Sequence, residues 1–250
     1  MNTIQSSIVQ YWDRRAASYT DVIQQNLSGK WENVWADELI SHFPDKEDIK
    51  VLDIGTGPGF YAIILAKRGY NVIAVDYSEG MLCEARNNAG PLADNIRFLR
   101  MDAQNLEFED NSFDVIVTRN LTWNLPDPVK AYSEWYRVLK DDGVMLNFDA
   151  NWYAYLFDED KKDAYIQDRA NVKEAGMSDH EGYEEADKME RISRDLPMGK
   201  IARPAWDIAV LLSKGFRNVH ADTSIGDRVW NPEEKLNYAS TPGFLITAVK

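Results

Sequence analysis

Apolar positions follow two different spacings along this chain, and the change between them marks the start of a predicted sheet. Up to about residue 45 the spacing is roughly helical, as at Trp31, Val34 and Trp35, and Pro44 ends the pattern. Short apolar runs rich in β-branched residues then recur at residues 49–54, 71–75, 96–101, 113–118 and 144–148. Continuous runs of this length are typical of strands buried on both faces of a parallel sheet.

The segments between these runs have helical spacing. Val129, Tyr136 and Leu139, for example, share one face of a predicted helix, and a polar turn at 141–143 is expected to end it. Strand and helix therefore alternate through this part of the chain. Such alternation predicts a doubly wound, Rossmann-like α/β sheet with helices on both faces.

A polar, acidic segment interrupts this alternation after the fifth run. Residues 158–195 hold 13 acidic and 7 basic side chains and no run of the buried-strand type, so we expect a helical insertion that acts as a substrate lid. A later helix and two further strands complete a sheet of seven mostly parallel strands; they are expected at 204–213, 217–225 and 243–249. The chain then divides into a helical extension, a sheet core, the insertion and a C-terminal completion, at 1–45, 46–150, 151–203 and 204–250.

Composition and charge narrow the class of protein. The chain has 250 residues, of which 44% are hydrophobic, so it can bury a core. Its net charge of −13 makes electrostatic binding to the phosphate backbone of nucleic acid unfavourable, and we expect no nucleic-acid partner. No apolar run reaches the roughly 18 residues of a membrane span, and the first residues do not resemble a secretory signal. With Cys83 as the single cysteine, these features predict a cytoplasmic protein without disulfides, and they do not predict its oligomeric state.

The most informative segment is a glycine-rich turn at residues 51–60, which read VLDIGTGPGF. A buried strand leads into Gly55, Gly57 and Gly59, and a helix follows. Glycines at such a turn allow a ligand to approach the backbone, and the amides of the loop and of the helix N-terminus face that ligand. The Gly-Lys-Ser/Thr ending of a phosphate-binding loop is absent, because Phe60 and Tyr61 stand there.

Three aspartates lie at the ends of successive predicted strands. Asp53 stands two residues before the first glycine, where a carboxylate repels a pyrophosphate and attracts an ammonium group. Asp76 ends the next strand, where an acid can accept hydrogen bonds from both ribose hydroxyls. Asp102 ends the third strand and suits the exocyclic amine of adenine. We therefore expect the three carboxylates to converge on one nucleoside that carries an amino group.

These segments resemble the class I S-adenosylmethionine-dependent methyltransferases, specifically the group that acts on small molecules. The resemblance covers residues 10–150 and is carried by 51–60, 72–81, 98–106, 113–127 and 136–148. It implies S-adenosylmethionine as cofactor. It also implies that the methionyl part, the ribose, the adenine and the sulfonium contact Asp53, Gly55, Thr56, Gly57, Asp76, Tyr77, Met81, Asp102, Ala103, Asn120 and, from the N-terminal helix, Tyr19.

The acceptor is expected to be a small molecule. The chain lacks the Asn/Asp-Pro-Pro-Tyr/Phe segment of enzymes that methylate DNA bases, and Arg119 stands where magnesium-dependent relatives have an aspartate, so no metal is expected. Aromatic residues at 151–157, including Trp152 and Tyr153, together with Trp123, either line the acceptor pocket or pack the insertion against the sheet.

Two further groups have alternative roles. Arg119 either binds an acidic substrate or pairs with a surface carboxylate. His180, in the acidic insertion, is the single candidate for a general base, whereas His42 and His220 are expected to be structural.

The leading hypothesis is a methyltransferase that transfers a methyl group in line to a small molecule. A nicotinamide-dependent oxidoreductase on a similar sheet is the first alternative, and it is disfavoured by Asp53 and by the Gly-x-Gly-x-Gly spacing. A non-catalytic module that binds the same cofactor is the second alternative. An RNA methyltransferase conflicts with the negative charge.

Overall fold

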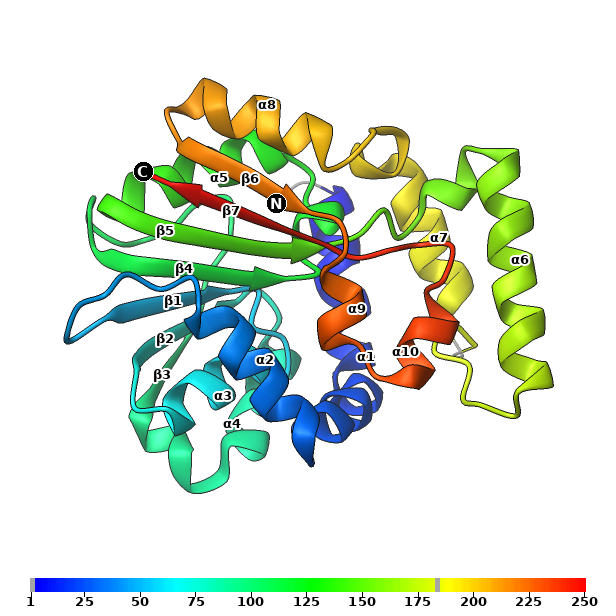
Figure 1. Ribbon diagram of the computed structural model, residues 1–250, viewed down its shortest axis with the longest axis horizontal. Helices are drawn as coiled ribbons and strands as arrows, with labels where there is room; N and C mark the ends of the chain where they lie inside the picture. The colour runs from blue at the N-terminus through cyan, green and yellow to red at the C-terminus, as the bar shows by residue number, and fades with distance from the viewer. Residues whose placement is uncertain (1–2, 183–184) are drawn as a thin grey trace.

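A seven-stranded sheet runs through the centre of the protein (Figure 1). The structure is a computed structural model that describes residues 3–182 and 185–250. The strands lie in the order β3 (Ile96–Arg100), β2 (Asn71–Asp76), β1 (Lys50–Ile54), β4 (Phe113–Arg119), β5 (Leu139–Asp149), β7 (Phe244–Val249) and β6 (Arg217–Asp222). The first five are parallel, and β7 is antiparallel to both of its neighbours. The prediction of seven mostly parallel strands is confirmed.

Helices cover both faces of the sheet because successive strand residues point to opposite sides. In β1, Val51 belongs to a core shared with the helices on one face, whereas Leu52 and Ile54 belong to the core on the other. The first core includes α2 (Lys30–Ile40), α3 (Phe60–Lys67) and α9 (Ile225–Val229), and the second includes α5 (Pro128–Val138) and α8 (Ala205–Lys214). The chain order reverses between β1 and β4, and in open α/β sheets ligands bind at such a reversal.

The polar turn at 141–143 lies inside β5, so the prediction that it separates a helix from the strand is wrong. Helix α5 ends at Val138, and Leu139 already pairs with Phe113 in the sheet. The pairing register then shifts, and the exposed residues Asp141 and Asp142 bulge out before the regular ladder resumes at Val144. Burial of Leu139 against the sheet outweighs the turn preference of the polar residues after it.

The helical N-terminal extension and the helical insertion are both confirmed. Helix α1 (Thr3–Asn26) is separated from α2 by Gly29, whose φ of 70° suits a residue without a side chain. Helix α1 packs against α4 (Glu79–Ala89) and α7 (Ala186–Asp195). The insertion also contains α6 (Glu159–Glu174), which stands at the edge of the molecule in Figure 1, and the short helices η3 (Ala154–Leu156) and η4 (Met198–Lys200).

Between β6 and β7 the structure differs from the prediction. The strand expected to reach residue 225 ends at Asp222, whose carboxylate accepts hydrogen bonds from the amide and the hydroxyl of Ser224 at 2.8 and 2.7 Å. Two short helices follow there, α9 and α10 (Pro232–Asn237). The remaining short helices are η1 (Gly90–Asn95) and η2 (Thr122–Asn124).

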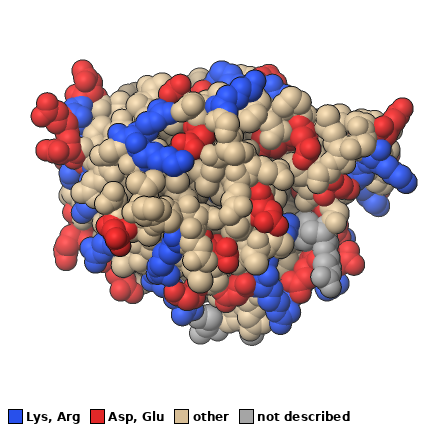
Figure 2. Space-filling model, turned by 90° about the horizontal axis from the view of Figure 1, so that it is seen from below, with Lys and Arg blue, Asp and Glu red and all other residues tan. Residues whose placement is uncertain are grey.

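Charge is dispersed over the surface seen in Figure 2. Lysine and arginine side chains alternate with acidic ones on that face, without a continuous basic stripe. Among the helices formed by residues 3–182 and 185–250, none combines the length and the apolar character that crossing a membrane requires.

Candidate functional site

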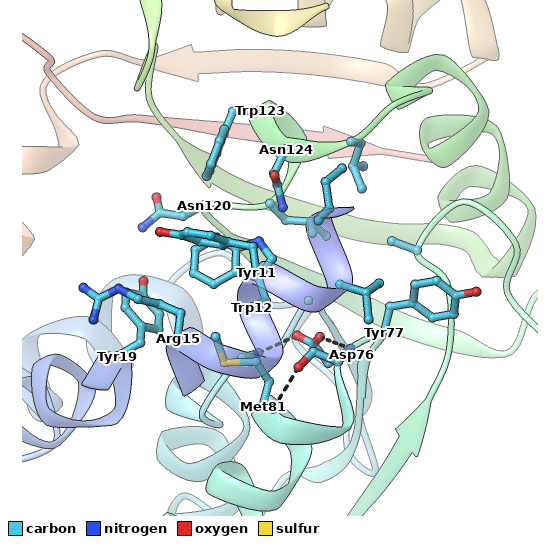
Figure 3. Close-up of a pocket in the computed structure, with 18 of the residues that line it drawn as sticks. Tyr11, Trp12, Arg15, Tyr19, Asp76, Tyr77, Met81, Asn120, Trp123 and Asn124 are labelled. Atoms are coloured by element: carbon cyan, nitrogen blue, oxygen red, sulfur yellow. Dashed lines mark hydrogen bonds between the residues drawn. The ribbon is translucent and has the colours of Figure 1, made fainter. Parts of the chain in front are cut away.

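A cavity of about 210 Å³ lies at the carboxyl ends of the parallel strands, and helix α1 forms part of its wall (Figure 3). Its lining comes from α1, the glycine loop, the ends of β2, β3 and β4, the segment after β5, the insertion and the end of α10. The sequence-predicted residues that line it are Tyr19, Gly55, Gly57, Asp76, Tyr77, Met81, Asp102, Ala103, Arg119, Asn120, Trp123, Trp152, Tyr153 and His180.

The glycine loop presents its backbone to this cavity. The amides of Gly55 and Thr56 donate to the carbonyl of Val75 at 2.8 and 3.0 Å, which ties the loop to β2. Gly55 has φ +67°, and a Cβ there would lie 2.8 Å from the side chain of Leu121. Gly57 has φ +52° and open space where a Cβ would project. A ligand can therefore approach the backbone at Gly57.

Asp53 and Thr56 lie behind the loop and are not among the residues that line the cavity. One carboxylate oxygen of Asp53, Oδ2, accepts hydrogen bonds from the hydroxyl of Thr56 at 2.6 Å and from the amide of Ala62 at 3.0 Å. Burial raises the pKa of Asp53 to about 7. Asp53 thus holds the loop against the start of α3, and two of the three carboxylates expected to share one cleft reach it.

Asp76 is the first of these two. Its carboxylate accepts hydrogen bonds from the amides of Gly57 and Ser78, both at 2.9 Å, and so joins the loop to the start of α4. Burial raises the pKa of Asp76 to about 6, and these backbone donors oppose that rise. A carboxylate has about four acceptor positions, so Asp76 retains capacity for two hydroxyl donors.

Asp102 is the second, and it contacts helix α1. Its Oδ1 accepts hydrogen bonds from the amide and the side chain of Gln104, at 2.9 and 3.1 Å. Its Oδ2 accepts one from Nε2 of Gln5 at 2.6 Å. Asp13 on the same helix accepts a hydrogen bond from the amide of Gly80 at 3.1 Å, in the first turn of α4. Helix α1 is therefore attached to both sides of the expected adenosine position.

The other end of the cavity is an aromatic chamber, formed by Trp12, Tyr19, Trp123, Trp152, Tyr153 and Tyr238. Ring centroids of Trp123 and Tyr153 lie 5.0 Å apart, as do those of Trp152 and Tyr238. In Figure 3, Trp12 lies between Trp123 and Asp76. Tyr153 also packs in a hydrophobic cluster with residues of α7, so the two roles considered for these aromatics are compatible.

Six buried polar atoms of residues that line the cavity have no hydrogen-bond partner within the described ranges. They are the indole nitrogens of Trp123 and Trp152, the amide oxygens of Asn120 and Asn124, and Nε and Nη1 of Arg119. Asn120 has φ +54°, and its own amide donates to the carbonyl of Phe148 at 2.8 Å. Buried polar groups are normally paired, so these six atoms are suited to binding a ligand with its own polar groups.

Arg119 does not pair with a surface carboxylate, and that alternative is wrong. Its partner is Glu234, whose side chain is 4% exposed and which lies 3.8 Å away. The guanidinium also lies over the rings of Trp35 and Phe60, with centroid distances of 4.8 and 4.6 Å. These contacts hold Arg119 at the floor of the cavity.

A buried ionic network positions Trp123. Arg203 donates to Asp149 at 2.7 Å and to Asp207 at 2.9 Å, and all three side chains have an exposed fraction of 0%. The same oxygen of Asp149 accepts a hydrogen bond from the amide of Trp123 at 3.0 Å. The network therefore connects the start of α8 to the short helix η2, which carries this wall of the chamber.

His180 is the histidine that reaches the cavity among the three in the chain. Its Nδ1 lies 3.1 Å from the hydroxyl of Tyr238, and its Nε2 lies 2.8 Å from Glu233. His42 instead contacts Glu38 at the end of α2, and His220 lies in β6, so neither lines the cavity.

Sequence reasoning missed the lining residues Gln5, Tyr11, Trp12, Arg15 and Tyr238. An available signal for the α1 residues was the amphipathic repeat that places Trp12 and Tyr19 on one side of a helix. Tyr238 had no local signal, because it reaches the cavity only through the packing of α10 against the insertion.

Most of the known proteins that the chain resembles are named as methyltransferases. Residues 52–147 match a family described as a methyltransferase domain. The chain is 37% identical over 144 residues to the ubiquinone/menaquinone biosynthesis C-methyltransferase UbiE of Rickettsia prowazekii, a match that covers 54% of this chain and 58% of that protein. It is 30% identical over 150 residues to the demethylmenaquinone methyltransferase of Staphylococcus epidermidis, covering 58% of each. The chain thus spans little more than half the length of these curated relatives.

Solved structures share the fold. Phosphoethanolamine N-methyltransferase 2 of Haemonchus contortus, in complex with S-adenosyl-L-methionine, has a TM-score of 0.68 at 19% identity, covering 97% of this chain and 60% of that one. A SAM-dependent methyltransferase from Aquifex aeolicus has a TM-score of 0.57 at 20% identity, covering 92% of this chain and 97% of that one. At these identities the likeness concerns the fold.

Proposed function

We propose that the chain is a class I S-adenosylmethionine-dependent methyltransferase that transfers the methyl group to a flat aromatic molecule with hydroxyl groups. One observation carries the proposal: a single cavity joins the glycine loop, Asp76 and Asp102 at one end to the aromatic chamber at the other. A donor and an acceptor bound at these two ends would meet between them.

The end of the cavity at the glycine loop has hydrogen-bonding groups that match those of S-adenosylmethionine. Asp76 can accept from the two ribose hydroxyls, and Asp102 with Ala103 can hold the adenine edge. The backbone at Gly57 is open to the methionyl part, and Gly55 lies beside it in the lining of the cavity. Tyr77 and Met81 would flank the adenine, and Tyr19 and Asn120 would lie near the sulfonium. Of the predicted cofactor residues, Asp53 and Thr56 would support the loop from behind.

When bound, this cofactor supplies a methyl group already activated by a sulfonium. The protein's part is then to align the acceptor with that methyl group and to exclude water, and orientation of this kind can contribute about 7–11 kcal/mol. Aromatic faces beside a sulfonium add about 0.5–2 kcal/mol each. The rings of Trp12 and Tyr19, whose centroids are 5.7 Å apart, are suited to that role.

The aromatic chamber supports a flat acceptor that carries polar groups. Its walls are ring faces, and the unpartnered atoms of Asn120, Asn124 and Trp152 can hydrogen-bond hydroxyl or carbonyl groups. The names of the curated relatives refer to quinones, which are flat and oxygenated. The chamber's Trp152 and Tyr153 lie beyond the matched residues 52–147, so the identity of the acceptor depends on this chain's own side chains.

Two measurements test the proposal. Calorimetry with S-adenosylhomocysteine should give micromolar or tighter binding that is weakened at least tenfold in Asp76→Ala. It should be unchanged in Asp222→Ala, a matched aspartate that ends a strand outside the cavity. Titration with NADH should show no binding. An absence of S-adenosylhomocysteine binding at high micromolar concentration would overturn the proposed function.

The acceptor class is tested by incubating the protein with S-adenosylmethionine and either menadiol, 2-naphthol or catechol. Mass spectrometry should detect a monomethylated product together with S-adenosylhomocysteine. The amine 2-phenylethylamine serves as the contrasting acceptor. Cofactor binding without methylation of any aromatic hydroxyl compound would overturn the acceptor class and leave the methyltransferase assignment in place.

A further inference from the structure

We propose that Tyr238, His180 and Glu233 form a proton relay that removes the acceptor's proton during methyl transfer. The inference deepens the proposed function and rests on it. It assigns a catalytic role to Tyr238, which lines the aromatic chamber, and a proton-accepting role to the histidine behind it.

The relay is a continuous chain of hydrogen bonds. Oη of Tyr238 and Nδ1 of His180 are 3.1 Å apart, and Nε2 of His180 and Oε1 of Glu233 are 2.8 Å apart. An ionised Glu233 can only accept, so Nε2 carries the ring proton. The neutral imidazole then leaves Nδ1 free to accept from the Tyr238 hydroxyl. This assigns the tautomer that a proton acceptor requires.

The backbone of His180 is fixed to α10, which contains Glu233 and ends directly before Tyr238. The amide of His180 donates to Oδ1 of Asn237 at 3.0 Å. The side-chain amide of Asn237 donates to the carbonyls of Ser178 and Glu233, at 2.9 and 3.1 Å. Asn237 is 2% exposed, so this clamp is shielded from water.

The two ends of the relay differ in their exposure to solvent. The side chain of His180 is 9% exposed, whereas that of Glu233 is 33% exposed. The Tyr238 end thus faces the cavity and the Glu233 end reaches solvent. A proton taken up from the cavity has a route to water through the imidazole.

The charged groups around the relay are mostly acidic. Glu181 lines the cavity beside His180, and burial raises its pKa while Arg169 opposes that rise. Glu234 follows Glu233 on α10 and pairs with Arg119. A protonated imidazole would therefore be stabilised by the carboxylate of Glu233, which it contacts directly, at the moment it forms.

Methyl transfer is coupled to the movement of one proton along the relay. A lone pair on the acceptor forms a bond to the methyl carbon, and the carbon–sulfur bond breaks with its electron pair remaining on sulfur. The acceptor's proton moves to Oη of Tyr238 as the phenolic hydrogen moves to Nδ1 of His180. The imidazolium then loses one proton to water at the Glu233 end, and proton exchange with water restores the tautomer with Nε2 protonated and Nδ1 bare, so one proton is released for each methyl group transferred.

Kinetics on the fastest acceptor from the aromatic panel test the relay. Tyr238→Phe keeps the ring that packs on Trp152, and it should lower kcat about 100-fold or more while KM and the affinity for S-adenosylhomocysteine change less than threefold. His180→Gln should act similarly, and Glu233→Gln should lower kcat about 10-fold because it removes the charge that stabilises the imidazolium. Full kcat in Tyr238→Phe or His180→Gln would overturn the relay.

Matched controls lie outside the cavity. His42→Gln removes the imidazole of another His–Glu contact, and Tyr70→Phe removes a hydroxyl from a ring that packs on Phe43. Both should retain the wild-type kcat. A comparable loss in these controls would show that the relay variants act through general destabilisation, and that outcome would also overturn the assignment.

A spectroscopic measurement tests the relay without any acceptor. Nitrogen-15 NMR of the three histidine rings, with His42→Gln and His220→Gln for assignment, should show His180 protonated at Nε2 and bare at Nδ1 in the neutral form. Tyr238→Phe and Glu233→Gln should each shift the His180 ring nitrogens. A proton on Nδ1, or ring shifts unchanged by both variants, would overturn the relay even where methyl transfer itself is confirmed.

Discussion

Replacing Asp53 by asparagine would remove a buried charge while keeping its hydrogen bonds. The hydroxyl of Thr56 and the amide of Ala62 both donate to Oδ2 of Asp53, so one amide oxygen in the same place can accept both. The variant therefore isolates the effect of the charge on stability. We expect it to change the pH dependence of unfolding.

The magnitude follows from the pKa of Asp53, which burial raises from 3.8 to about 7. A carboxyl group whose pKa is higher in the folded state binds its proton more tightly there. Its stabilising contribution is complete below pH 3.8 and is lost as the pH rises to 7. Each pH unit well inside this window corresponds to about 1.4 kcal/mol, and the slope falls to half near the folded-state pKa, so the wild type should lose about 2.3 kcal/mol more than Asp53→Asn between pH 5 and pH 7.

Urea unfolding at pH 5, 6, 7 and 8 measures this difference, with the exposed Asp21→Asn as the matched control. Most of the change should fall below pH 7, and above pH 8 the difference between Asp53→Asn and the wild type should be constant. Equal pH dependence in the two proteins would refute the reasoning. Binding of S-adenosylhomocysteine should be unchanged in Asp53→Asn, because the carboxylate lies behind the loop. A tenfold loss of affinity would instead show that it contacts the ligand's amino group.

Two further predictions concern Asp76 and Arg203. Because hydroxyl donors favour the ionised form of Asp76, whose pKa is raised to about 6, affinity for S-adenosylhomocysteine should fall as the pH drops below 6. Calorimetry between pH 5 and pH 8 should show this fall in the wild type and not in Asp76→Asn; an affinity independent of pH would contradict it. Arg203→Met should lower the free energy of unfolding by about 3–5 kcal/mol, because it leaves Asp149 and Asp207 buried without a counter-charge. Arg217→Met, which removes an exposed pair with Asp142, should cost less than about 1 kcal/mol, and equal thermal shifts in the two variants would refute this.

The sequence alone was enough to predict the layered sheet, the cofactor family and the edge of the sheet at which the cavity lies. These features depend on short-range patterns: apolar runs of strand length, glycines where the chain turns, and an acid at the end of each of three strands. Parallel strands place their carboxyl ends along one edge, so Asp76 and Asp102 could be expected to lie near each other before any contact was known. Both line the cavity, whereas their direct contacts with a cofactor stay predictions.

Tertiary structure decided which side chains face the cavity. Asp53 shares its face of β1 with Val51, because strand residues alternate in direction, and that face is packed against α3. Nothing within a few residues of Asp53 specifies which face of the sheet α3 will cover. The meeting of His180 and Tyr238, 58 positions apart in the chain, likewise depends on how the insertion packs against α10. Local sequence determines backbone conformation, whereas contacts between distant segments depend on how the whole core is filled, and those contacts shape the acceptor end of this site.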